Sequence, residues 1–152
     1  MEDWEHAAHH AVRETLTRYT WSGDFDDEAG FLENFLADGV LEIKGDRILE
    51  GHDGIRQLFA PPDAGDRVGP SSGPLRHHVS SIRIVIESPT RARAWSYFTN
   101  LGPHGLDHWG RYADVLVPHG SEGRWLFQHR RVSIDGASAE SVAFPGGAIP
   151  SR

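Results

Sequence analysis

The sequence contains no cysteine among its 152 residues, which excludes a disulfide framework and any thiolate site for metal or catalysis. A chain without cysteine suits the reducing cytosol, and we expect a cytoplasmic protein. The charged N-terminus lacks the apolar core of a signal peptide, and no apolar run approaches the roughly 20 residues of a membrane span. Basic blocks are also absent, and the net charge is −7. We therefore expect neither a nucleic acid nor an anionic membrane as a partner.

Large aromatic residues are well represented, with five Trp, seven Phe and three Tyr. A chain of this length buries about two-thirds of its unfolded surface, so its core needs no disulfide or metal. We expect one domain over residues 1–135. The remaining residues, 136–152, are rich in Gly, Ala, Ser and Pro, which predicts a loosely ordered tail.

The N-terminal half has helical patterning. Apolar residues recur at spacings of three and four, which predicts helices over 3–22, 27–37 and 53–60. A short hairpin, with strands over 40–43 and 47–49, is expected between the second and third helices.

The C-terminal half has strand patterning. A loop rich in proline and glycine covers 61–74. Four strand-like runs, separated by turn residues, follow it over 76–87, 91–101, 108–117 and 124–134. This order predicts an α+β fold in which three helices pack on one face of a curved, mostly antiparallel sheet and enclose a pocket.

The other face of such a sheet has no helix to cover it. Trp95, Trp109 and Trp125 fall on the predicted strands. Large aromatic side chains left on an uncovered face favour association. We therefore expect a homodimer or homotrimer that uses the outer face of the sheet.

Several local strings, in their order and spacing, resemble a known family over roughly residues 8–134. The strings are Arg18-Tyr19-Thr20 with Gly23-Asp24, Phe35 to Glu42, Glu50 to Ile55, Arg76 to Ser81, Gly110 to Asp114, and Gly123-Arg124-Trp125. The chain resembles the SnoaL-like family of the cone-shaped nuclear transport factor 2-like superfamily, and its scytalone dehydratase branch most of all.

The resemblance implies a catalytic pair, Asp24 and His77, which match an acid and a histidine of scytalone dehydratase. A buried carboxylate beside imidazole fixes its tautomer and raises its basicity, so the ring can remove a proton next to a carbonyl. The same ring can then protonate a leaving hydroxyl. The resemblance thus implies a cofactor-free lyase (dehydratase) or isomerase, without a metal, acting on a small apolar or cyclic, polyketide-like carbonyl compound.

His77 and His78 compete for the catalytic place, because side chains alternate along a strand and only one of the two can face the pocket. The parity of Ile82, Ile84 and Ile86 belongs to His78, whereas the family resemblance favours His77. A β-bulge between them, or an apolar outer face used for oligomerisation, would reconcile the two. We follow the resemblance.

Supporting site residues are expected on the following strands. Scytalone dehydratase has a further histidine near this region, where His104 and His108 are the candidates. Three more side chains could line the cavity, namely Tyr97, Tyr112 and Asp114, and a tyrosine hydroxyl could polarise a carbonyl.

The sequence departs from scytalone dehydratase at Gly23 and Ile43, where that enzyme has tyrosines. Two other functions therefore stay open. One is an epoxide hydrolase or cyclase on the same fold, which requires an Asp–Arg–Asp arrangement around a water. The other is a non-catalytic ligand-binding or assembly module.

Overall fold

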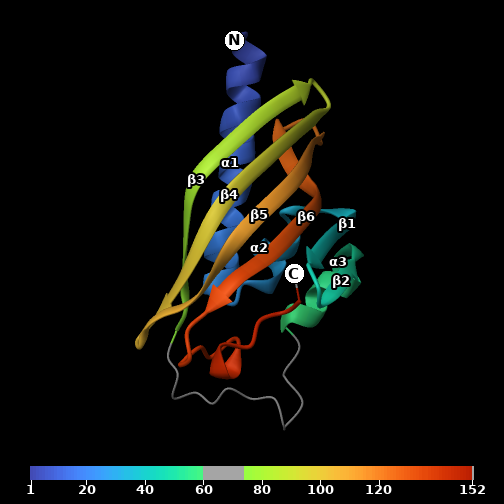
Figure 1. The fold of residues 1–152 in the computed structure, drawn as a ribbon. Coiled ribbons are helices and arrows are strands. Elements are labelled where there is room, and N and C mark those ends of the chain that lie inside the picture. Colours follow the sequence, from blue (N-terminus) through green and yellow to red (C-terminus); the bar gives the residue numbers. More distant parts are fainter. Residues whose placement is uncertain (60–73, 152) are drawn as a thin grey trace.

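The computed structural model describes residues 1–59 and 74–151, so the predicted loop over 61–74 lies outside the described residues except for its last position. Helices and strands alternate little along the chain (Figure 1). Their order is α1 (Asp3–Asp24), α2 (Glu28–Leu32), β1 (Phe35–Ile43), β2 (Arg47–Glu50), α3 (Gly51–Ile55), the 3₁₀ turn η1 (Arg56–Phe59), β3 (Arg76–Ser88), β4 (Arg91–Gly102), β5 (Gly105–His119), β6 (Arg124–Ala137) and the 3₁₀ turn η3 (Pro145–Gly147).

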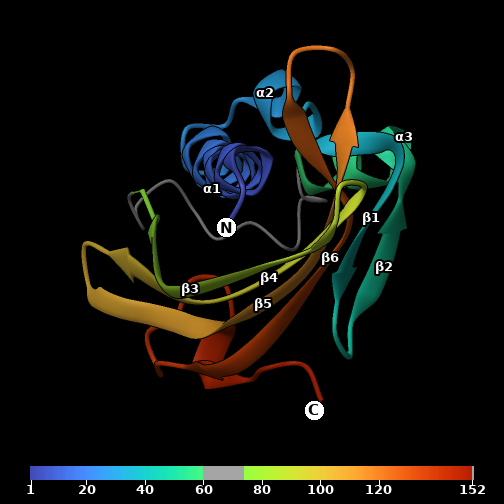
Figure 2. The same cartoon turned by 90° about the horizontal axis from the view of Figure 1, so that it is seen from above.

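The six strands form one curved sheet in the order β2-β1-β6-β5-β4-β3. Only β1 and β6 are parallel, and every other pair is antiparallel. Helices α1 and α2 lie on the concave side of the sheet, where α1 packs against β3 and β6 (Figure 2). The predicted α+β fold is confirmed.

Helix α1 follows the predicted periodicity and extends it by two residues. Its N-terminus is closed by a capping box between Glu2 and Glu5. Ala8, Val12 and Leu16 then recur every four residues and are buried against the sheet. This long straight element carries its last residue to the rim of the sheet, where the candidate site lies.

The second predicted helix was wrong in its second half. Helix α2 ends at Leu32, and Phe35 already begins β1 by pairing with Phe127 of β6. The side-chain amide of Asn34 donates to the last carbonyls of the helix and ends it. The apolar run was read with a helical period, but parallel pairing with a distant strand decides its conformation.

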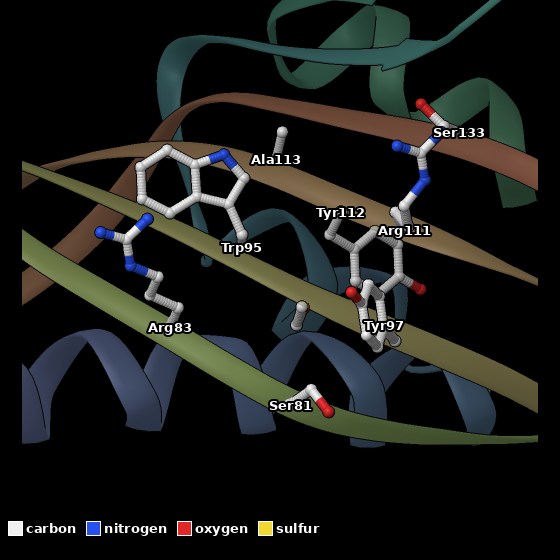
Figure 3. Close-up of a pocket in the computed structure, with 9 residues that line it drawn as sticks. Ser81, Arg83, Trp95, Tyr97, Arg111, Tyr112, Ala113 and Ser133 are labelled. Atoms are coloured by element: carbon white, nitrogen blue, oxygen red, sulfur yellow. The ribbon is translucent and has the colours of Figure 1, made fainter.

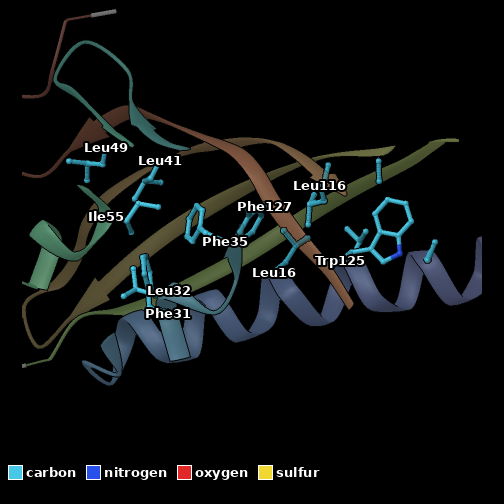
Figure 4. Packing of buried hydrophobic residues seen from close by; sticks show 14 residues of the cluster. Leu16, Phe31, Leu32, Phe35, Leu41, Leu49, Ile55, Leu116, Trp125 and Phe127 are labelled. Atoms are coloured by element: carbon cyan, nitrogen blue, oxygen red, sulfur yellow. The ribbon is translucent and has the colours of Figure 1, made fainter. Parts of the chain in front are cut away.

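The core lies between α1, α2, α3 and the concave face, and it is dominated by phenylalanine and leucine (Figure 4). Its larger members are Leu16, Phe31, Leu32, Phe35, Leu41, Leu49, Ile55, Leu116, Trp125 and Phe127. None of the helices in residues 1–59 and 74–151 is long and apolar enough to cross a membrane.

The prediction that Trp125 belongs to an outer aromatic patch was wrong, because this side chain is buried in the core against α1. Trp109 and Tyr97 are exposed on the outer face, and Trp95 is half-buried. The outer face therefore carries aromatic residues of β4 and β5 but not of β6.

Candidate active site

The Asp24 carboxylate joins the end of α1 to the start of β3. Its Oδ1 lies 2.6 Å from Nδ1 of His77, and its Oδ2 accepts the backbone N–H of His77 at 3.0 Å. Arg76 donates to the Asp24 carbonyl at 3.0 Å, which caps the C-terminus of α1. One carboxylate thus orients the imidazole and fixes its backbone. Because Nδ1 faces an ionised oxygen, it carries the ring proton, and Nε2 keeps its lone pair.

A β-bulge settles which histidine faces inward. The register of β3 against β4 shifts between Ser80 and Arg83, and Ser81 has a φ of 50°. The bulge reverses the parity of the strand, so His77 shares the inner face with Ile82 although their numbers differ in parity. His78 is exposed, and it borders a surface hollow that Asp24 and His77 also line.

Three polar side chains form a row across the inner face of the sheet. In the strand register, Asn100 of β4 lies opposite His77 of β3 on one side and opposite His108 of β5 on the other. Its side-chain nitrogen lies 3.2 Å from Nε2 of His77 and 3.4 Å from Nε2 of His108. Directly opposed residues on one face are close enough for such bonds.

A second Asp–His pair ends this row. Oδ2 of Asp107 lies 2.7 Å from Nδ1 of His108. Neighbouring strand residues normally point to opposite faces, but the register shifts here, since Asn100 opposes His108 while Leu101 opposes Leu106. The bulged residue is Asp107, whose side chain is turned into the protein together with its neighbour.

The Asp107 carboxylate is fully buried and surrounded by donors. It accepts hydrogen bonds from Ser141 Oγ and the Val142 backbone N–H, both at 2.7 Å, and His104 Nε2 lies 3.0 Å away. Burial alone would raise the pKa of Asp107, but the bonds from His108, Val142 and Ser141 lower it to about 2. Burial lowers the pKa of His108, although Asp107 partly offsets this effect.

The segment after β6 therefore closes the site instead of extending into solvent. Strand β6 runs to Ala137, beyond the predicted domain limit at 135. Ser141 and Val142 then bind Asp107, and the ring of Phe144 packs edge-on against His108 with centroids 5.1 Å apart. Glycine- and serine-rich composition gave no sign of these contacts.

Asp114 of β5 and Arg130 of β6 form a buried ion pair that is separate from the two Asp–His pairs. Arg130 donates two bonds of 2.8 Å to the Asp114 carboxylate, and both residues are buried. The guanidinium also lies about 4 Å from the ring centres of Tyr19, Tyr112 and Phe127. Burial raises the pKa of Asp114, and the cation beside it offsets part of that rise.

The three remaining candidate residues differ in how deeply they are buried. Tyr112 is buried beside Arg130 and stacks on Phe98, and burial raises its pKa well above the ordinary value. Tyr97 is 57% exposed on the outer face, so the prediction that it lines the inner cavity was wrong. His104 contacts Asp107 from the β4–β5 turn and is half-buried.

An apolar cavity of about 220 Å³ adjoins His77 on the helix side. Its walls come from α1, α2, η1 and β3. The lining residues are Tyr19, Thr20, Gly23, Asp26, Phe31, Leu58, Phe59 and His77. Mostly apolar walls with a few polar groups, here Thr20, Asp26 and His77, are typical of small-molecule pockets. The volume is below the roughly 300 Å³ at which such pockets usually begin, so the cavity suits a compact ligand.

A different hollow, of about 380 Å³, lies on the outer face of the sheet (Figure 3). Trp95, Tyr97 and two arginines, Arg83 and Arg111, project into it, away from α1. It has no acid–base pair like that of the inner site. Within the described parts of the chain, no group of three or more His, Asp or Glu residues is arranged to hold a metal ion.

The sequence-based predictions missed Asn100, Asp107, Ser141 and Arg130. The sequence did contain a signal for Asn100. A polar residue at an inward-facing position of an alternating strand such as β4 needs a hydrogen-bond partner when it is buried. Asp107 gave no such signal, because its inward direction depends on a bulge.

The sequence matches the SnoaL-like domain family over residues 4–131, which is most of the chain. The chain belongs to the SnoaL-like family. None of the curated proteins compared with the sequence matches it.

Solved structures of similar shape include several SnoaL-like folds. A candidate scytalone dehydratase from Novosphingobium aromaticivorans has a TM-score of 0.72 at 19% identity, covering 88% of both chains. Hexachlorocyclohexane dehydrochlorinase LinA-type3 from Novosphingobium barchaimii has a TM-score of 0.72 at 15% identity, covering 89% of this chain and 91% of that one. A Catenulispora acidiphila protein in complex with S-DNPA has a TM-score of 0.68 at 23% identity, with 84% and 92% covered. At these identities the likeness shows the shared cone fold.

Proposed function

We propose that this SnoaL-like protein is a cofactor-free lyase that eliminates water from a small, cyclic or polyketide-like carbonyl compound, with the Asp24–His77 pair as its acid–base group. The observation that carries the proposal is the 2.6 Å contact between Asp24 Oδ1 and His77 Nδ1, beside an apolar cavity. Catalysis by proton transfer needs a base held in one orientation, and this contact supplies it.

The reaction needs only a protein side chain to remove the proton and to return it. Nε2 of His77 takes a proton from the carbon next to the carbonyl, and the C–H electrons form the enolate. The enolate then expels the β-hydroxyl, which leaves as water with the proton returned from Nε2. Asp24 stays ionised and stabilises the imidazolium that exists between the two steps. Return of the proton to another carbon would instead give isomerisation.

The cavity and the comparisons favour this chemistry over the alternatives. Apolar walls beside His77 suit a compact apolar substrate. Two structural neighbours are named for eliminations, one of water and one of hydrogen chloride. An epoxide hydrolase needs carboxylates on both sides of an arginine, whereas the bonds of Arg130 in the described residues reach only Asp114.

The proposal is tested by incubating the protein with a panel of small cyclic β-hydroxy ketones and following enone absorbance. Replacement of a general base costs about 10²- to 10⁴-fold in rate. We expect Asp24→Asn and His77→Ala to lose activity within this range while keeping the fold, as judged by circular dichroism.

His10→Ala is the control, because this histidine is exposed in the N-terminal half of α1 and lines neither hollow that His77 lines. It should retain wild-type turnover. Equal losses in His77→Ala and His10→Ala would contradict the assignment. No turnover of any panel member, combined with tight binding of a ketone, would instead identify a binding module.

A further inference from the structure

Asn100 sits between the two Asp–His pairs, and a single amide nitrogen serves both rings. This side chain is 2% exposed, and its nitrogen lies 3.2 Å and 3.4 Å from the Nε2 atoms of His77 and His108. An amide nitrogen has two hydrogens and no lone pair to offer, so it can satisfy two acceptors at once.

The carboxylates decide what each Nε2 presents to this amide. Nδ1 of His77 faces Asp24, and Nδ1 of His108 faces Asp107, at 2.6 Å and 2.7 Å. Each Nδ1 therefore carries a proton, and each neutral ring has a lone pair on Nε2. Two lone pairs converge on two amide hydrogens. The opposite amide orientation would require both rings to be imidazolium cations, facing each other in a half-buried site.

We propose that Asn100 is a positioning residue that donates its two amide hydrogens to His77 and His108 and thereby holds both imidazoles neutral until substrate arrives. A hydrogen bond to the neutral form of a base disfavours its protonated form. Asp24 and Asp107 act in the opposite direction, because a carboxylate favours imidazolium. Asn100 thus counteracts the two acids and keeps Nε2 unprotonated. When substrate binds, the lone pair on Nε2 of His77 must leave the amide hydrogen before it takes the substrate proton.

Charged and titratable groups face this row from each element packed on it. They are Asp24 at the end of α1, Arg76 of β3, Asp107 and Tyr112 of β5, and His104 of the β4–β5 turn. Phe98 and Phe144 contribute only apolar rings. Asn100 is the neutral group that contacts both imidazoles, and a change of its charge should be felt by both.

The test is a pH titration of ¹⁵N-labelled histidine rings by NMR, in the wild type and in Asn100→Asp. The variant keeps the shape, removes both donors and adds an anion. We expect the pH at which both rings take up a proton to rise by about one to two units. Thr99→Asp is the control, since it adds the same charge one residue away, on the opposite face of β4. It should move the two midpoints much less.

Two results would overturn the inference, namely unchanged midpoints in Asn100→Asp or equal shifts in Thr99→Asp. If Asn100→Asp fails to fold, the wild type still decides. Its Asn100 side-chain NH₂ signals should shift as both rings titrate, and signals that follow neither ring would refute the proposal.

The catalytic meaning of this arrangement rests on the proposed lyase function, but the NMR readout needs no substrate. Shifted midpoints in an inactive protein would retain the role of Asn100 and remove the lyase. Turnover that depends on His77, with unmoved midpoints, would do the reverse.

Discussion

At the residue scale, Asp107 couples the stability of the fold to pH. Its pKa is lowered from 3.8 to about 2 by the donors that surround it. A depressed pKa stabilises the fold fully above the unfolded value, and the contribution is lost as pH falls toward the folded value. The window is therefore from about pH 4 down to about pH 2, and the shift corresponds to about 2 kcal/mol.

Urea unfolding at pH 7 and at pH 2.5 measures this contribution. Wild type should lose stability between the two, and Asp107→Asn should lose about 2 kcal/mol less, because it has no carboxylate to protonate. Asp46→Asn, at an exposed turn position, provides a control for the general effect of removing one acid. An identical pH dependence in wild type and Asp107→Asn would contradict this role of Asp107.

At the scale of elements, close contact between β4, β5 and β6 depends on a glycine. A Cβ atom on Gly110 would lie 2.0 Å from the backbone oxygen of Ser133 and 2.9 Å from the ring of Phe98. That ring packs about 6 Å from both His77 and His108. A methyl group at this position must therefore separate β5 from β6 and displace the ring that supports the site.

We expect Gly110→Ala to lower the free energy of unfolding by about 1–3 kcal/mol or more, as overpacking does. Its catalytic rate should fall with it. Gly120→Ala is the comparison, because its Cβ would meet no atom within 4 Å and only its positive φ is strained. That variant should cost about 1 kcal/mol and leave activity intact. Equal stability of Gly110→Ala and wild type would contradict this prediction, because it would show that β5 and β6 can separate at no cost in free energy.

At the scale of the whole molecule, the outer face of the sheet is only partly covered within the described chain, where Pro150 and Ser151 lie beside Arg111 and Ser133. Tyr97 and Trp109 are exposed there, next to a hollow lined by two arginines. Exposed aromatic patches of this kind mark association surfaces. We therefore still predict a homodimer or homotrimer that associates through this face, although Trp125 does not contribute to it.

Analytical ultracentrifugation at micromolar concentration should give two or three times the chain mass of 16.9 kDa. Tyr97→Glu should shift the mass toward one chain, because a carboxylate buried in an interface has no partner. Thr17→Glu, on the exposed side of α1, should not. A wild-type mass near 17 kDa would refute the prediction.

The sequence by itself determined the fold class, because helical and strand periods separate cleanly into two halves of the chain. Local strings also indicated membership in the SnoaL-like family, and the pair of Asp24 and His77 was a hypothesis that came from that resemblance. Periodicity and local strings depend on neighbouring residues, and neighbouring residues are what a sequence displays.

The tertiary structure alone decided everything that depends on register. The bulge at Ser81 turned His77 inward, the bulge at Asp107 brought a second acid to His108, and pairing with Phe127 converted the end of a predicted helix into β1. Ser141 reached Asp107 over 34 residues of chain. A single inserted residue reverses the face of every following side chain in a strand, and hydrogen bonds between distant strands set that insertion.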